Sequence, residues 1–128
     1  MKVITLPFGK INILNPHIAE VIINEGITLD KQEVQDYNQV LRSNLEPPFS
    51  VLINRENAYT YTFEAQLELG RFNDIVYRAV VAYNRNAEMA TQIIMDLNKN
   101  SNWNIKIFRE RQTALNWLYT QINNRNAR

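Results

Sequence analysis

Polar and aromatic side chains gather directly after a short apolar segment, within residues 49–61 of the chain. The segment begins Phe-Ser-Val-Leu-Ile and then presents amides, a guanidinium, a carboxylate and two phenols, at Asn54, Arg55, Glu56, Asn57, Tyr59 and Tyr61. In open α/β sheets, ligands and partners bind outside the carboxyl ends of the strands. This loop is therefore the predicted working surface of the protein.

The loop lacks the groupings that catalysis or metal binding requires. The sequence shows no nucleophile paired with a base, no glycine-rich phosphate cradle and no cluster of metal ligands there. The single histidine, His17, stands in an Asn-Pro-His turn, and the sequence shows no catalytic partner for it. We therefore predict a non-enzymatic protein with no catalytic residue, no metal ion and no cofactor.

Each residue of the predicted partner-binding set has a recognition role and a structural role open to it. Arg55 can bind a carboxylate or phosphate through two parallel hydrogen bonds, or it can hold its own loop. Asn54 and Asn57 can bind a partner's backbone or close the turn after the strand. Tyr59 and Tyr61 are two residues apart, so an extended loop points both to one side, as a contact surface or as the edge of the core. We expect function to depend on Arg55 and Tyr59.

Apolar runs bounded by turn residues predict six strands. They are Lys2–Leu6, Lys10–Leu14, Ile18–Asn24, Phe49–Ile53, Ile75–Tyr83 and Ile105–Phe108. Short turns separate the first three, which predicts an antiparallel meander. The later strands are separated by helices, so they are expected to pair in parallel through right-handed crossovers. The continuous apolar runs of Phe49–Ile53 and Ile75–Tyr83 place these two strands side by side in the middle of the sheet.

Two helices are predicted on either side of the Phe49 strand. Asp30 with Glu33 three residues later has the arrangement of a capping box, and Pro47-Pro48 ends the helix that follows it. Thr62 is the expected cap of a short second helix, which ends at Gly70.

Two more helices are predicted towards the carboxyl end of the chain. Asn84 or Asn86 caps the third helix. Apolar residues at helical spacing predict the buried stripes of the two helices, namely Ala87, Ala90, Ile94 and Leu97 in the third and Ala114, Leu115, Leu118 and Ile122 in the last. Met89, Ile93 and Met95 lie off the stripe of the third helix, which suggests an exposed patch for a partner or a second copy.

Arg78 interrupts the otherwise apolar strand Ile75–Tyr83. A guanidinium in a central strand needs a carboxylate partner or a place at the open end of the strand. Because Arg78 lies near the start of the strand, the open end is the expected position.

Length and composition limit the class of protein. With 128 residues, the chain is expected to form a single domain, residues 1–128, that buries a core without disulfides. The absence of cysteine suits a reducing compartment. A net charge of +1 is too balanced to indicate nucleic acid or an anionic membrane as a partner. No apolar run approaches the ~20 residues of a membrane helix, and no signal peptide is visible, so we expect a cytoplasmic protein without stable membrane insertion.

Several short motifs, spread over almost the whole chain, fit this order of elements. They are Asn24-Glu25-Gly26, Pro48-Phe49, Asn54-Arg55 with Asn57 and Tyr59, and Phe108 followed by Ala114-Leu115-Asn116-Trp117-Leu118. Together they resemble the STAS/SpoIIAA-like superfamily, and most of all its small stand-alone bacterial members. The resemblance implies an α/β domain of SpoIIAA-like fold, with a mixed sheet, an N-terminal antiparallel meander and four helices in the order βββαβαβαβα.

The same resemblance implies a regulatory or protein-interaction module whose partner is another protein. The expected exposed patch at Met89, Ile93 and Met95 makes a homodimer a further expectation. In the anti-anti-sigma factors of this superfamily, a phosphorylatable serine follows the fourth strand. This chain has neither Ser nor Gly at residues 54–62, where Thr60 and Thr62 are the hydroxyls of the right kind. Either is a possible phosphorylation site, and a plain helix cap is the other interpretation of Thr62.

A second class of function stays open, that of a small-molecule or lipid-binding protein with an apolar pocket under its helices. The broader superfamily is often grouped with the CRAL-TRIO-like lipid carriers. A deep apolar pocket would favour the carrier, whereas a flat polar and aromatic face would favour a partner protein.

Overall fold

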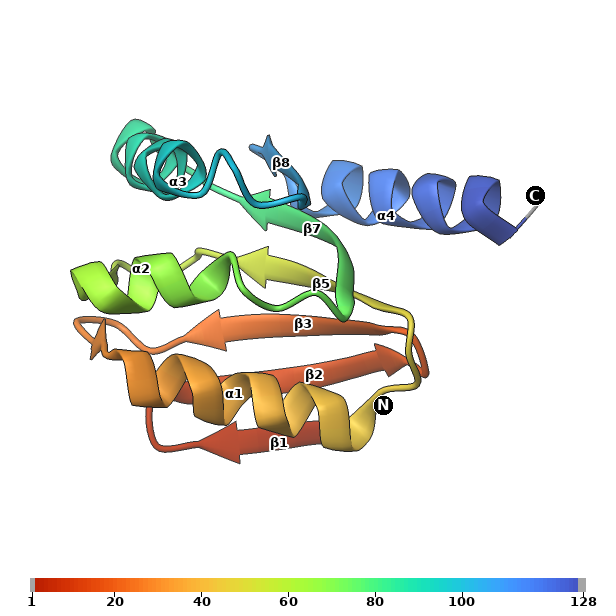
Figure 1. Cartoon of the computed structure of the whole chain (residues 1–128), viewed down its shortest axis with the longest axis horizontal. Helices are drawn as coiled ribbons and strands as arrows, with labels where there is room; N and C mark the ends of the chain where they lie inside the picture. Colours follow the sequence, from red (N-terminus) through yellow and green to blue (C-terminus); the bar gives the residue numbers. More distant parts are fainter. Residues whose placement is uncertain (1, 127–128) are drawn as a thin grey trace.

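The structure of the chain, a computed structural model, describes residues 2–126. Its main feature is a six-stranded sheet with the order β1-β2-β3-β5-β7-β8. Helices α1, α2 and α3 cover one face, and α4 lies against the other (Figure 1). The strands are β1 (Lys2–Leu6), β2 (Gly9–Asn15), β3 (Ile18–Ile23), β5 (Phe49–Asn54), β7 (Ile75–Val81) and β8 (Asn104–Phe108).

The pairing of the strands confirms the predicted mixed sheet. β1, β2 and β3 pair antiparallel, as expected for a meander joined by short turns. β3, β5, β7 and β8 pair in parallel, and β5 and β7 are neighbours inside the sheet. Since all four parallel strands point the same way, their carboxyl ends meet at one edge of the sheet.

Two further strands were not expected from the sequence. β4 (Thr28–Leu29) and β6 (Thr60–Tyr61) form a separate two-stranded parallel sheet. The backbone of Gly26 also donates a hydrogen bond to the carbonyl of Ala58 at 2.7 Å. These bonds join the loop after β5 to the segment before α1, so the predicted working loop is anchored to residues 26–29.

The helices begin where the capping residues predict. Asp30 and Glu33 form the complete capping box, with hydrogen bonds of 2.8 and 3.1 Å. The Thr62 hydroxyl and the Asn84 amide oxygen accept the backbone N–H groups at the third position of the next two helices. The helices are α1 (Lys31–Asn44), α2 (Phe63–Leu69), α3 (Arg85–Leu97) and α4 (Arg111–Asn126). In residues 2–126, none of them combines the length and the apolar character needed to cross a membrane.

The central strands are buried on both faces, which explains their continuous apolar sequences. Val51 of β5 points into the layer beneath α1, α2 and α3, whereas its neighbour Leu52 points into the layer beneath α4. The α4 layer consists of Ile18, Leu52, Ala79, Val81, Phe108, Ala114, Leu115 and Leu118. The buried stripe of the last helix is thus confirmed at its first three positions.

Helix α3 differs from its predicted orientation. Ile94 is buried as expected, but Leu97 is 38% exposed, so its place in the buried stripe was wrong. Met89 and Ile93 are 53% and 56% exposed, as the sequence pattern suggested, whereas Met95, the third residue of the expected patch, is half-buried. The helix turns Thr91 inward and leaves an apolar row at 89, 93 and 97 on its outer face.

A buried carboxylate joins α4 to the sheet. Glu20 of β3 is 3% exposed and accepts hydrogen bonds from Arg111 Nε and Nη2 at 2.8 and 3.0 Å. The side-chain amides of Asn54 and Asn12 donate to the same carboxylate at 2.9 and 3.2 Å. Burial by itself raises the pKa of Glu20, but these hydrogen bonds more than offset it and hold the pKa below its ordinary value.

Candidate partner-binding site

An open groove of about 630 Å³ lies at the edge where the parallel strands end. Its walls are the segment after β3, the loop after β5 and the first turns of α3. The residues that line the groove include Glu25, Arg55, Glu56, Asn57, Thr60, Asn84, Asn86 and Ala90. The loop predicted from the sequence is therefore one wall of this groove.

Most of the predicted partner-binding side chains of the loop are too buried to contact a partner directly. Asn54, Arg55 and Tyr59 are only 4%, 6% and 6% exposed. Asn57 and Tyr61 are half-buried. A partner-binding role for all five residues would need accessible side chains, but α3 and the strand β4 cover the loop and place three of them inside.

Arg55 holds the loop against α3. Its Nη1 donates to the Thr91 hydroxyl and its Nη2 to the carbonyl of Tyr59, both at 3.2 Å, and the guanidinium lies 4.6 Å from the centre of the Tyr59 ring. Arg55 therefore holds its own loop in place, which is the second of the two roles that the sequence left open for it. Any effect of Arg55 on a partner therefore acts through the position of the loop and of α3.

The two loop amides also bind within the protein. Asn54 lies on the opposite face of the sheet from Arg55, where it donates to Glu20. Asn57 donates to the carbonyl of Ile23 at 2.9 Å and closes the loop onto the end of β3. Asn57 thus performs the turn-closing role that the sequence left open, whereas Asn54 binds the buried carboxylate of Glu20.

The two tyrosines of the loop form an aromatic pair at the edge of the core. The rings of Tyr59 and Tyr61 meet edge to face, with centroids 5.5 Å apart and hydroxyl oxygens 3.5 Å apart. Burial raises the pKa of both phenols above the ordinary value of 10, so both are neutral at physiological pH.

The two candidate phosphorylation sites differ in availability. Thr62 accepts the N–H of Ala65 as the cap of α2, so its hydroxyl is already engaged. Thr60 is exposed, lies in the wall of the groove and has its hydroxyl 3.1 Å from that of Thr28. Phosphorylation stays a prediction, and Thr60 is the more accessible of the two.

Several residues that line the groove were not predicted from the sequence to be part of the site. Glu25 accepts the backbone N–H of Ala58 at 3.0 Å, and Asn84, Asn86 and Ala90 come from α3. A usable signal was present, because residues that follow neighbouring parallel strands must lie at the same edge. Applied to β3 and β7 as well as β5, it would have included the residues after all three strands.

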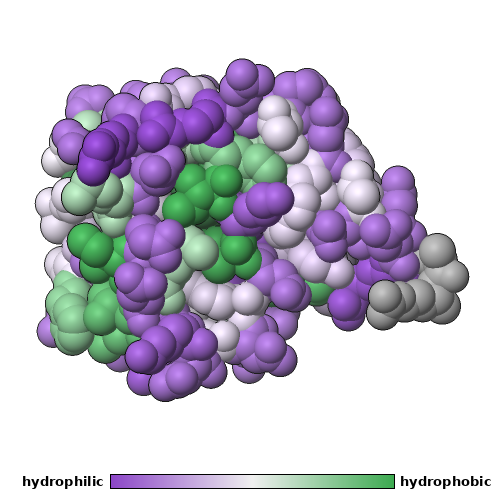
Figure 2. Space-filling view, turned by 90° about the horizontal axis from the view of Figure 1, so that it is seen from above, coloured by the Kyte–Doolittle hydropathy of each residue, from purple (hydrophilic) through white to green (hydrophobic). Residues whose placement is uncertain are grey.

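The groove continues into the apolar row of α3. The apolar side chains of Met89 and Ile93 lie next to Ala90 on the helix surface, and Ala90 lines the groove. The groove and the apolar row are therefore contiguous on one helix. Figure 2, seen from the side of α3 and β8, shows apolar surface gathered on this side of the molecule among hydrophilic residues. A contiguous apolar surface beside polar groups is typical of a protein-interaction site.

The acidic and histidine side chains of the described part of the chain do not gather into a metal-binding cluster at the groove. Within residues 2–126, no three His, Cys, Asp or Glu side chains come together as a metal site would require. What the groove does present is two exposed carboxylates, Glu25 and Glu56, with several side-chain amides.

Comparison with known proteins supports the fold. No family model and no curated protein matches the sequence. The structure is similar to the crystal structure of an uncharacterized DUF3478-family protein from Shewanella loihica PV-4, which has a SpoIIAA-like fold. The TM-score is 0.53 at 15% sequence identity, and the similarity covers 91% of this chain and 90% of that one. The chain therefore has the SpoIIAA-like fold that the sequence resemblance implied.

Proposed function

We propose that the chain is a non-enzymatic interaction module that binds a partner protein across the groove and the apolar row of α3. The observation that carries this proposal is the exposure of three large apolar side chains, Met89, Ile93 and Leu97, on one helix face beside a polar groove. The resemblance to regulatory proteins supports the same class of function. We further propose that the protein acts in the cytoplasm, a reducing compartment that suits a chain without cysteine.

The chemistry of the surface indicates the kind of partner. Protein interfaces combine an apolar centre with a polar rim. Here the α3 row supplies the centre, while Glu25, Glu56 and Asn86 at the groove supply the rim. We therefore propose a partner with apolar anchors for α3 and with basic or amide groups for the two carboxylates.

The carrier alternative has less support. The cavity beneath α2 and α3 has a volume of about 30 Å³, which is room for one or two water molecules rather than a lipid chain. The larger groove is open and lined by polar groups as well as apolar ones.

Photo-crosslinking in the protein's own cells tests the proposal. A benzophenone amino acid at position 93 is expected to give one discrete covalent adduct, because this position lies at the centre of the proposed interface. The control carries the same amino acid at Gln112, which is exposed on α4. The adduct is identified by mass spectrometry, and twice the mass of this chain would identify a second copy.

A charge substitution provides the matched control for folding. With the crosslinker at position 89, Ile93→Asp is expected to abolish the adduct, because a carboxylate in an apolar interface must lose its water. Its free energy of unfolding should change by only about 0.5 kcal/mol, since Ile93 is 56% exposed. Absence of an adduct at both positions, or the same adducts at position 112, would refute the proposal.

A further inference from the structure

We propose that a small monovalent anion, of the size of a halide or a carboxylate group, binds beside Arg55 and Arg78 in the pocket beneath α2 and α3. The side chains of Arg55 and Arg78 both contribute to the lining of this pocket, and the two residues are only 6% and 3% exposed. The proposal goes beyond partner binding, because the pocket lies under α3 rather than on its outer face.

The hydrogen-bond partners of both guanidiniums are uncharged. Arg78 Nη2 donates to the carbonyls of Leu69 and Phe72, both at 3.1 Å, and its guanidinium lies 4.8 Å from the centre of the Trp103 ring. The expected position at an open strand end was therefore wrong, because the segment after α2 and Trp103 cover this side chain. The hydrogen-bond partners of Arg55, the Thr91 hydroxyl and the Tyr59 carbonyl, are also neutral, and its buried Nε has no hydrogen-bond partner.

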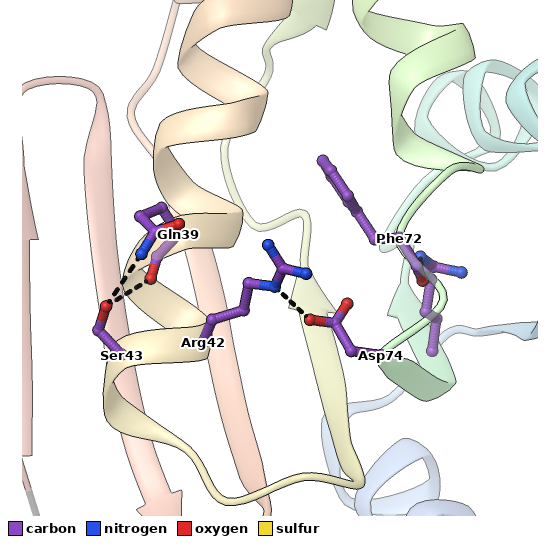
Figure 3. A network of polar contacts seen from close by, with 6 residues as sticks. Gln39, Arg42, Ser43, Phe72 and Asp74 are labelled. Carbon is purple, nitrogen blue, oxygen red and sulfur yellow. Dashed lines mark hydrogen bonds and ion pairs between the residues drawn. The ribbon is translucent and has the colours of Figure 1, made fainter.

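No carboxylate in residues 2–126 forms an ion pair with either guanidinium. Asp74 accepts a hydrogen bond of 2.6 Å from Arg42 Nε, at the end of α1 (Figure 3). Glu68 accepts the side-chain amide of Gln35 at 2.9 Å and lies 3.9 Å from Arg71. The acids near the pocket thus form their ion pairs and hydrogen bonds with other partners, while the charge of Asp74 still favours the cationic form of Arg78 by raising its pKa.

The surrounding phenols do not supply negative charge either. Burial raises the pKa values of Tyr37, Tyr59 and Tyr61 above the ordinary 10, so all three are neutral at physiological pH. Burial also lowers the pKa of Arg78 to about 10, which leaves this side chain a cation. The pocket therefore holds positive charge that an incoming anion would compensate.

The size and walls of the pocket select the class of anion. A volume of about 30 Å³ admits a single small ion or the end of a carboxylate. Ile53, Ile94 and Ile105 form apolar walls, which disfavour strongly hydrated ions such as sulfate or a phosphate dianion. Trp103 and Ile105 are half-exposed, and we place the mouth of the pocket beside them.

Thermal unfolding in matched salts tests the site. Replacement of sodium fluoride by sodium bromide at constant ionic strength is expected to raise the melting temperature by roughly 3–6 °C, with saturation at millimolar bromide. Arg78→Met should abolish the saturable rise, because it removes one guanidinium while keeping most of the volume. Arg42→Gln, which removes an exposed guanidinium, should leave the rise unchanged. Sodium acetate in the same titration shows whether a carboxylate replaces the halide.

Anomalous scattering from a bromide-soaked crystal provides a test that does not depend on the variants. We expect a bromide peak within hydrogen-bonding distance of the Arg55 and Arg78 nitrogens. Peaks confined to other places, a melting response that never saturates, or an equal response in folded Arg78→Met would each overturn the proposal. None of these outcomes bears on crosslinking at position 93, so the two proposals can fail separately.

Discussion

Replacement of Arg111 by Met is expected to lower the free energy of unfolding by about 2–4 kcal/mol at pH 7. The change leaves the Glu20 carboxylate, 3% exposed, without its cation. The expected loss lies below the upper range for a fully buried pair, because the Arg111 side chain is 40% exposed and water screens it. Urea melts measure the effect.

The pH dependence of this loss has a definite sign. In the wild type, the pKa of Glu20 lies below its ordinary value of 4.5, so its stabilising contribution is present above that value and is lost as the pH falls through the folded-state pKa. Without Arg111, burial dominates and the folded-state pKa rises. The difference between wild type and variant should therefore shrink as the pH is lowered from 7 to below 4.5.

Two further variants control this prediction. Glu20→Gln in the Arg111→Met background removes the unpaired charge and should recover most of the lost stability. Arg109→Met breaks an exposed pair with Glu88 and should cost less than about 1 kcal/mol. An Arg111→Met loss as small as that of Arg109→Met would show that the buried network does not stabilise α4.

Truncation of Leu118 to Ala is expected to cost about 2–5 kcal/mol. Leu118 is fully buried and packs in the layer of Leu52 and Ala79 beneath α4. Because α4 is the helix that covers this face, other side chains have little freedom to fill the cavity. Denaturant melts measure the loss, and Tyr119→Ala at an exposed neighbour is the control. A loss below about 1 kcal/mol would mean that α4 does not dock as described.

Much of the fold could be predicted because it depends on local patterns. Asp30 and Thr62 begin helices through hydrogen bonds to residues three positions away, so nearby sequence is sufficient. Strands β5 and β7 could be paired because their apolar runs require two covered faces. By contrast, β4 and β6 contain two residues each, which is too few for a periodic pattern.

The state of the candidate site depends on distant contacts that local patterns do not specify. Arg55 is buried because Thr91, 36 residues later, lies over it. Glu20 is charged and buried because Arg111, 91 residues later, reaches it from α4. Leu97 faces outward because of how α3 packs on the loop and the sheet, a rotation that helical spacing alone does not determine.

Native mass spectrometry of the protein purified from its own cells tests most directly whether the α3 face binds a protein. We expect a complex heavier than the 15.0 kDa chain by the mass of a polypeptide, whether a partner or a second copy. Met89→Asp combined with Ile93→Asp should reduce it to the bare chain, whereas Tyr119→Asp on α4 should leave it intact. A wild-type chain that is bare, or that carries only a small molecule, would show that the α3 face does not bind a protein.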